Sequence, residues 1–80
     1  MMDILRILDR IVENHGGVTT HGYLNTYPHS VTYVIYDEDF NRIVFDTNTN
    51  MYEIRHNNGA INRTNTLDGF SLMLHALYSN

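Results

Sequence analysis

Residues 31–63 alternate apolar and polar side chains between short polar turns, and this pattern constrains the fold more than any other feature of the chain. Runs rich in β-branched and aromatic residues, with a period of two, are typical of half-buried strands. The pattern predicts three or four short strands, at residues 31–36, 42–46, 51–56 and 60–63. Connections this short favour sequential antiparallel pairing, which makes the sheet a meander.

The turns between these runs have recognisable chemistry. Residues 37–41 and 47–50 are rich in Asp, Asn and Thr, which hydrogen-bond their own backbone and break a strand. Asn58-Gly59 predicts a hairpin with a type I′ turn, because this dipeptide tolerates positive φ. Alternation then predicts one buried face that contains Ile43, Phe45, Tyr52 and Ile54. Residues 31–36 are apolar on both faces, so alternation leaves open whether Tyr33 and Ile35 or the alternate set joins this buried face.

Two amphipathic helices are predicted to flank the sheet. Residues 2–15 carry an apolar stripe at helical spacing, with Asp3 as N-cap and Gly16-Gly17 as the C-terminal stop. Residues 66–78 form a second helix, capped by Asn65 or Thr66. Residues 18–30 are open to two interpretations, because the sequence does not decide whether they form a strand. They could supply a first strand that ends at Pro28, but Gly22 weakens the pattern.

These elements predict a single α+β domain over residues 1–80. An antiparallel meander of three or four strands is flanked by an N-terminal and a C-terminal helix, both packed on one sheet face. The opposite face then has no helix to cover it. With 42% hydrophobic residues, a chain of 80 residues can still build one core.

Composition narrows the classes of function. The five basic residues are all arginine, and cysteine is absent, so the chain offers neither a Schiff-base lysine nor a disulfide. A net charge of −4 argues against nucleic acid as the direct partner. The sequence has neither a signal-peptide pattern nor an apolar run of membrane-spanning length, so we expect the cytoplasm, or the host cytoplasm if the chain is phage-encoded.

Motifs for catalysis or cofactor binding are weak. His15, His21 and His29 lie close in sequence but fit no metal-site spacing, so we expect no metal and no cofactor. His15-Gly16-Gly17 resembles the oxyanion segment of some esterases, but the nucleophile elbow those enzymes need is missing. Asp37, Glu38 and Asp39 are contiguous and diverge at a turn. We therefore expect a protein that is not an enzyme.

The uncovered sheet face is the candidate site for binding a protein partner. It is predicted to mix tyrosine, methionine, valine and arginine, a composition typical of interface centres. The acidic turn could dock in a basic groove of that partner, including a groove that binds nucleic acid. An alternative is a structural subunit that self-associates through this face. The candidate partner-binding residues are Tyr36, Asp37, Glu38, Asp39, Val44, Met51 and Arg55.

In size, acidity and helix–meander–helix layout, the chain resembles the small inhibitors that bacteriophages encode against host defences, anti-CRISPR proteins among them. The resemblance covers the whole chain as an architecture and involves no shared motif, so it assigns no functional residue. It implies a non-enzymatic inhibitor that acts by blocking a partner's surface.

Overall fold

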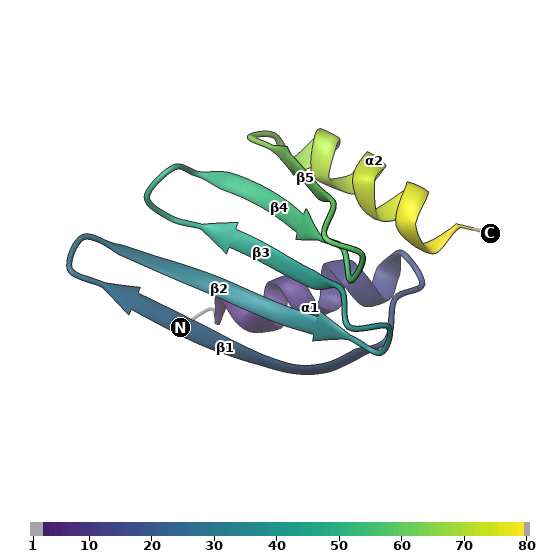
Figure 1. The fold of residues 1–80 in the computed structure, drawn as a ribbon, viewed down its shortest axis with the longest axis horizontal. Helices are drawn as coiled ribbons and strands as arrows, with labels where there is room; N and C mark the ends of the chain where they lie inside the picture. The colour runs from purple at the N-terminus through teal and green to yellow at the C-terminus, as the bar shows by residue number, and fades with distance from the viewer. Residues whose placement is uncertain (1–2, 80) are drawn as a thin grey trace.

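The computed structural model describes residues 3–79 and contains two helices and one five-stranded antiparallel sheet (Figure 1). The strands lie side by side in chain order, so β1 and β5 are the edges. In chain order the elements are α1 (Ile4–Asn14), β1 (Thr19–Tyr27), β2 (Ser30–Asp37), β3 (Arg42–Asp46), β4 (Met51–Arg55), β5 (Ile61–Thr64) and α2 (Leu67–Tyr78).

The predicted α+β fold is confirmed, with more strands than the three or four expected. Residues 18–30, for which the sequence left two interpretations, form β1 over nine residues, and the doubtful last strand forms as β5. Pairing with β2 explains why β1 forms despite Gly22, because eight residue pairs join the two strands. Met2, the first residue of the predicted N-terminal helix, lies outside the described residues.

Both helices begin at the predicted caps. The Asp3 carboxylate accepts the backbone N–H of Leu5 at 3.0 Å, and the Thr66 hydroxyl accepts that of Gly69 at 3.0 Å. Helix α1 ends in a Schellman motif: Gly16 has φ 94°, and the N–H groups of Gly16 and Gly17 bond the last free carbonyls. Both helix starts are therefore set by local sequence.

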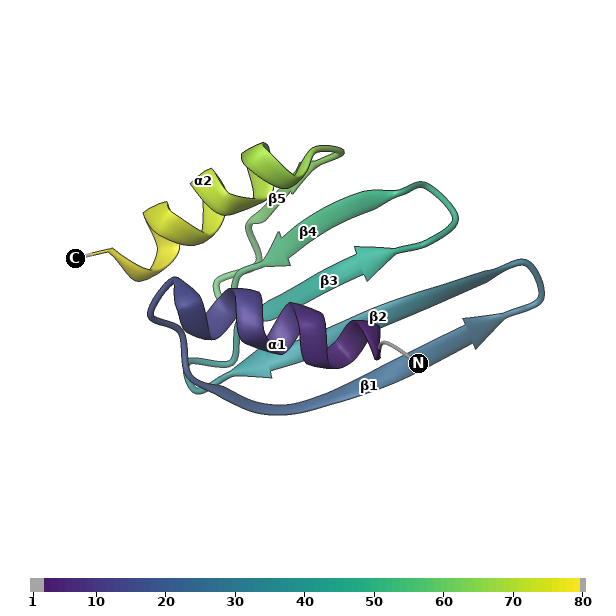
Figure 2. The ribbon, with the colours of Figure 1, turned by 180° about the vertical axis from the view of Figure 1, so that it is seen from behind.

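The two helices lie on the same face of the sheet (Figure 2), α1 against β1 and β2 and α2 against β4 and β5. Tyr52 stacks on Phe70 with ring centroids 4.7 Å apart, which joins β4 to α2. The predicted buried face of β3 and β4 is confirmed, and Tyr33 and Ile35 of β2 join it. The buried core consists of Leu8, Val12, Ile35, Ile43, Ile54, Phe70 and Leu74.

The turn between β4 and β5 differs from the predicted type I′ turn. Gly59 has φ 97°, as expected, but Asn58 does not have positive φ. The loop has three residues, because the His56 N–H bonds the Ala60 carbonyl at 2.8 Å and the Gly59 N–H bonds the His56 carbonyl at 3.0 Å. A type I turn followed by a left-handed glycine suits this loop length. The extra residue, Asn57, is held by hydrogen bonds to the β2–β3 turn.

Candidate functional site

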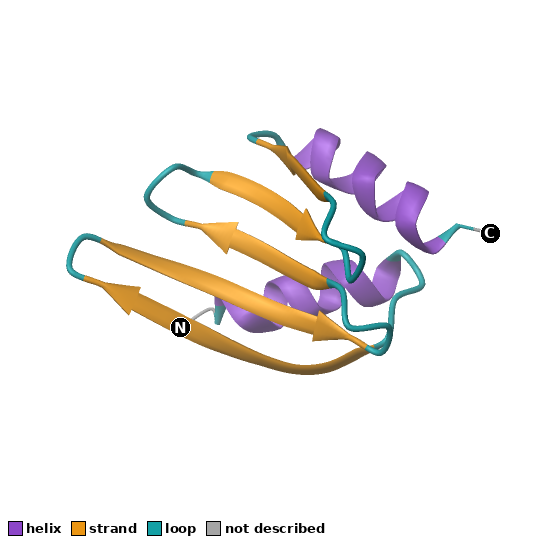
Figure 3. Cartoon of the chain, in the orientation of Figure 1, coloured by secondary structure: helices purple, strands orange, loops and turns teal. Residues whose placement is uncertain are grey.

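The sheet face opposite the helices, called the open face below, is the largest candidate surface. Figure 3 shows β1 to β4 in front of α1, with no helix across them. The register places alternate residues of the five strands on this side. The open face consists of His21, Tyr23, Asn25, Tyr27, Ser30, Thr32, Val34, Tyr36, Arg42, Val44, Asp46, Met51, Glu53, Arg55, Ile61 and Arg63.

A buried valine pair lies at the centre of the open face. Val34 of β2 and Val44 of β3 are cross-strand partners, and Val44 is 1% exposed although no helix covers it. Their outer neighbours in the same row are Tyr23 and Glu53, which are larger. Val44 therefore points to the predicted side, but its prediction as a contact residue is wrong, because larger neighbours exclude it from the surface.

An aromatic cluster stands beside the valine pair. The His21 ring stacks on Tyr36 with centroids 4.5 Å apart and planes 11° apart, and the Tyr23 ring lies 6.1 Å from Tyr36. Burial and then Tyr36 raise the pKa of Tyr23 above its ordinary value, while Arg42 acts in the opposite direction. The Tyr23 phenol is therefore protonated at neutral pH and can donate a hydrogen bond.

The open face concentrates arginine. Arg42 and Arg55 are direct cross-strand partners, an arrangement that is unfavourable for like charges. Glu53 offsets the positive charge of Arg55, because the Glu53 Oε1 lies 3.0 Å from the Arg55 Nε. Arg42 forms no ion pair with any residue from Asp3 to Ser79. Arg63 stands opposite Glu53 on β5. Arg42 is thus a positive charge available to an outside group.

Asp37 is not part of an exposed acidic tip, and its prediction as a contact residue is wrong. It is 1% exposed and shares the alternation of Tyr33 and Ile35, so it points toward the helices. Its carboxylate accepts the Asp39 N–H at 2.9 Å, the Asn41 N–H at 2.8 Å and the Asn41 amide at 2.9 Å. The Tyr78 hydroxyl adds a fourth bond at 2.7 Å. Asp37 therefore fixes the β2–β3 turn.

The other two acidic residues of this turn, Glu38 and Asp39, are exposed, as expected for a turn tip. Between them and β3 lies Phe40, which sequence reasoning missed. Phe40 is 75% exposed and has φ 64°, a conformation that costs a bulky residue roughly 1–3 kcal/mol. The Asp37 hydrogen bonds hold this backbone in place. The available signal was a large apolar residue inside a polar turn.

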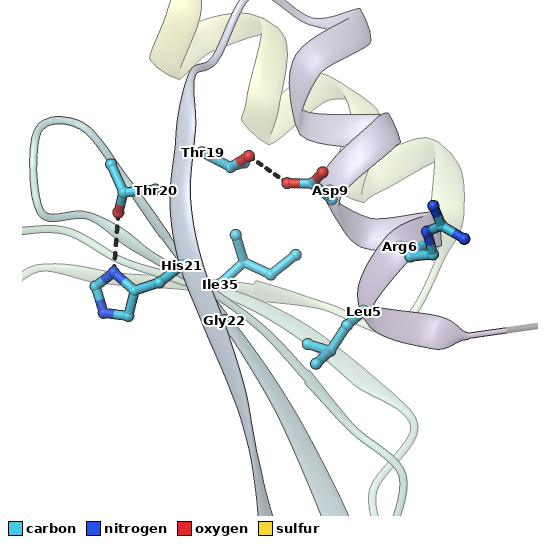
Figure 4. Close-up of a pocket in the computed structure, with 8 residues that line it drawn as sticks. All are labelled: Leu5, Arg6, Asp9, Thr19, Thr20, His21, Gly22 and Ile35. Atoms are coloured by element: carbon cyan, nitrogen blue, oxygen red, sulfur yellow. Dashed lines mark hydrogen bonds between the residues drawn. The ribbon is translucent and has the colours of Figure 1, made fainter.

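A small cavity of about 260 Å³ lies between α1 and β1 (Figure 4). The Thr19 hydroxyl donates to Asp9 across it. Thr20 and His21 point to the other side of β1, where the Thr20 hydroxyl lies 3.0 Å from the His21 Nδ1. The imidazole therefore does not face the Asp9 carboxylate. Leu5, Gly22 and Ile35 form the apolar part of the lining, and Arg6 is also among the lining residues.

The three histidines considered as metal ligands lie on different elements. His15 ends α1, with its Nδ1 2.8 Å from the Ile11 carbonyl, whereas His21 stands on the open face and His29 in the β1–β2 turn. Among residues 3–79, no three His, Asp or Glu side chains gather closely enough to hold a metal ion. Neither helix in this part of the chain has the length and apolar character needed to cross a membrane.

Comparison of the chain with protein-family models, with curated proteins and with solved structures gave no significant match.

Proposed function

We propose that this chain is a non-enzymatic module that binds another protein through its open face and blocks the surface it occupies. The observation that carries this proposal is the row of aromatic and arginine side chains around the buried valine pair. Large amphipathic side chains on a rigid, desolvated base are the usual centre of a protein interface.

The expected contact residues follow from orientation and exposure. Tyr36, Met51 and Arg55 are partly exposed on the open face and remain candidates from the sequence. Tyr23 and Arg42 join them, since both lie beside Tyr36. Arg42 is the cross-strand partner of Tyr36, and Tyr23 lies in the next row on β1. Glu38 and Asp39 lie at the rim, at the turn that follows Tyr36.

The charges describe the partner. An acidic group opposite Arg42 would complete an ion pair that residues 3–79 do not supply. Basic side chains of the partner opposite Glu38 and Asp39 would complement the charge of the rim. A partner with a basic groove, including a groove that binds nucleic acid, would supply such side chains. Size, acidity and layout support an inhibitor of the phage type, directed against a host protein.

The alternative function, a subunit that self-associates through the open face, has weaker support. Two copies meeting face to face would bring Arg42, Arg55 and Arg63 of each copy toward one another. Like charges that face each other across an interface cost several kcal/mol. The charge pattern of the open face therefore favours a different protein as its partner.

The test begins with capture of the partner from cells of the expected host, followed by binding kinetics of single variants. Tyr36→Ala and Arg55→Ala should each speed dissociation and cost about 2 kcal/mol or more if they are interface anchors. His75→Ala is the matched control, because His75 is exposed on α2, away from the open face. Unchanged binding of both open-face variants, with loss in the control, would place the site on the helices.

A further inference from the structure

The free edge of β1 presents unpaired backbone groups. The Val31 carbonyl accepts the Thr47 N–H at 3.0 Å, and the Asp37 N–H bonds the Asn41 carbonyl at 3.0 Å, so odd-numbered residues of β2 bond toward β3. Even-numbered residues of β2 therefore bond toward β1, to the odd-numbered residues that they pair with. It follows that Gly22, Leu24 and Thr26 direct their N–H and C=O groups away from the sheet.

From His21 to Tyr27 the edge of β1 carries little protection, because the one irregularity in its pairing with β2 lies earlier, between Thr19 and His21. Sheet edges are normally protected by charged residues, proline, short strand length or a covering element. Thr19–Tyr27 contains no Asp, Glu, Lys, Arg or Pro, and its nine residues make it the longest strand in the described chain. Figures 1 and 2 show that the β1–β2 hairpin extends past the start of α1, so the helix leaves the edge open.

The helix-side surface of β1 combines a projection with a hollow. Leu24 pairs with Tyr33 of the buried face, so its side chain points to the helix side, yet it is 50% exposed. Gly22, two residues earlier on the same side, has no side chain and borders the cavity lined by Leu5 and Ile35 (Figure 4). An exposed leucine therefore lies two residues from a hollow of about 260 Å³, whose lining is apolar at Leu5, Gly22 and Ile35 and polar at Arg6, Asp9 and Thr19.

We propose that two copies of this chain associate by antiparallel pairing of β1 with β1, centred on Tyr23, to form one continuous sheet. In this register Leu24 of each copy lies opposite Gly22 of the other, so each leucine enters the other copy's hollow. The Gly22–Leu24 pairs also exchange the backbone hydrogen bonds that the edge lacks. The pairing brings no charged side chains of β1 together, since the strand has none.

A second copy fits this edge better than an unrelated strand does, because the projecting Leu24 and the hollow at Gly22 belong to the same strand. A two-fold axis through the Tyr23 pair places the leucine of each copy at the hollow of the other. The open-face side of β1 is compatible with the same pairing. There the two-fold axis places Tyr23 beside Tyr23 of the other copy and His21 beside Asn25. This association uses the sheet edge, and among the contact residues proposed for the open face only Tyr23 lies at the β1–β1 seam. It therefore does not rest on the proposed function, and either can fail alone.

The first test is oligomeric state measured by sedimentation over a range of concentrations. We expect a monomer–dimer equilibrium for the parent chain and a dissociation constant raised about tenfold or more by Leu24→Arg. Leu72→Arg is the matched control, because Leu72 is 71% exposed on α2 and should leave the equilibrium unchanged. A parent chain that stays monomeric at its highest attainable concentration overturns the proposal, as does an unaffected Leu24→Arg dimer.

The second test fixes the register and does not depend on the Leu24 variant folding. The chain has no cysteine, so a single introduced cysteine reports one position. Tyr23→Cys should form a disulfide between copies, because directly opposed, non-hydrogen-bonded residues lie about 4.5 Å apart at Cα, within disulfide range. Asn25→Cys should not, since four residues of offset separate its two copies by roughly 13 Å. Efficient cross-linking at Asn25 without cross-linking at Tyr23 would overturn the proposed register.

Discussion

Replacing Tyr78 by phenylalanine isolates one hydrogen bond that joins the end of α2 to the β2–β3 turn. The hydroxyl donates to the buried Asp37 carboxylate at 2.7 Å, whereas the ring packs against Gly17, where a Cβ atom would come within 2.6 Å of it. Tyr78→Phe removes the bond and keeps the ring in place. Any loss of stability can therefore be assigned to the hydroxyl.

The expected loss in the free energy of unfolding is set by the acceptor of this hydrogen bond, which is the Asp37 carboxylate. A hydrogen bond to a charged group contributes about 1.5–3 kcal/mol. The lower end applies here, because Tyr78 is only half-buried and Asp37 keeps its bonds from Asp39 and Asn41. A loss of about 1.5 kcal/mol lowers the melting temperature of a domain of this size by roughly 6–12 °C.

The assay is urea and thermal unfolding followed by circular dichroism, with Tyr27→Phe as the control. Tyr27 is exposed at the end of β1, and no side-chain hydrogen bond joins its hydroxyl to the rest of residues 3–79, so its variant should match the parent within a few tenths of a kcal/mol. If Tyr78→Phe is as stable as Tyr27→Phe, the Asp37 bond does not hold α2 on the sheet and the reasoning is refuted.

The same residue predicts a dependence on alkaline pH. Burial, and then the Asp37 carboxylate, raise the pKa of Tyr78 above its ordinary value of 10.0. Because the folded-state pKa is the higher one, the unfolded chain releases this proton first. The contribution is therefore complete below about pH 10 and is lost progressively as the pH rises above it. Tyr78→Phe should remove this part of the alkaline loss of stability.

Other variants test the core, a turn and the rim. Leu74→Ala should lower the free energy of unfolding by roughly 2–5 kcal/mol, measured by urea titration, because Leu74 is fully buried. Gly59→Val should destabilise by roughly 1–3 kcal/mol, because Gly59 has φ 97° in open space and the cost is backbone strain alone. Reversing Glu38 and Asp39 to lysine should slow association with the captured partner and alter its salt dependence without unfolding the chain. A chelator should leave the melting temperature unchanged, since residues 3–79 gather no metal ligands.

Alternation was enough to predict which side of β3 and β4 is buried, because a one-residue shift would expose the whole apolar set. It left the buried side of β2 open, because both faces of that strand are apolar. In the structure Asp37 lies on the buried side of β2, in phase with Tyr33 and Ile35. Its acidic neighbours made the segment look like a solvated tip instead. The group that satisfies the buried carboxylate, Tyr78, is remote in sequence, so no local pattern could have revealed it.

The remaining surprises have the same origin in tertiary context. β1 lacks a clear alternating pattern because much of it is exposed on both sides, and its strand conformation follows from the hairpin with β2. Phe40 adopts positive φ because the loop length and the Asp37 hydrogen bonds determine its backbone, against its intrinsic preference. Candidate contacts at the open face were predictable in direction, but exposure was not, as Val44 shows.

The distribution of charge changes what the net charge of −4 means for binding. Three of the five arginines stand on the open face, with Asp46 and Glu53 as its acidic residues, so this face is more positive than the molecule as a whole. The remaining acidic residues are Asp37, which is buried on the helix side of β2, and residues on or next to the two helices and in the β2–β3 turn. A partner that approaches the open face therefore meets arginine and aromatic rings first. Its matching surface should be acidic at the centre and basic only at the rim, where Glu38 and Asp39 stand.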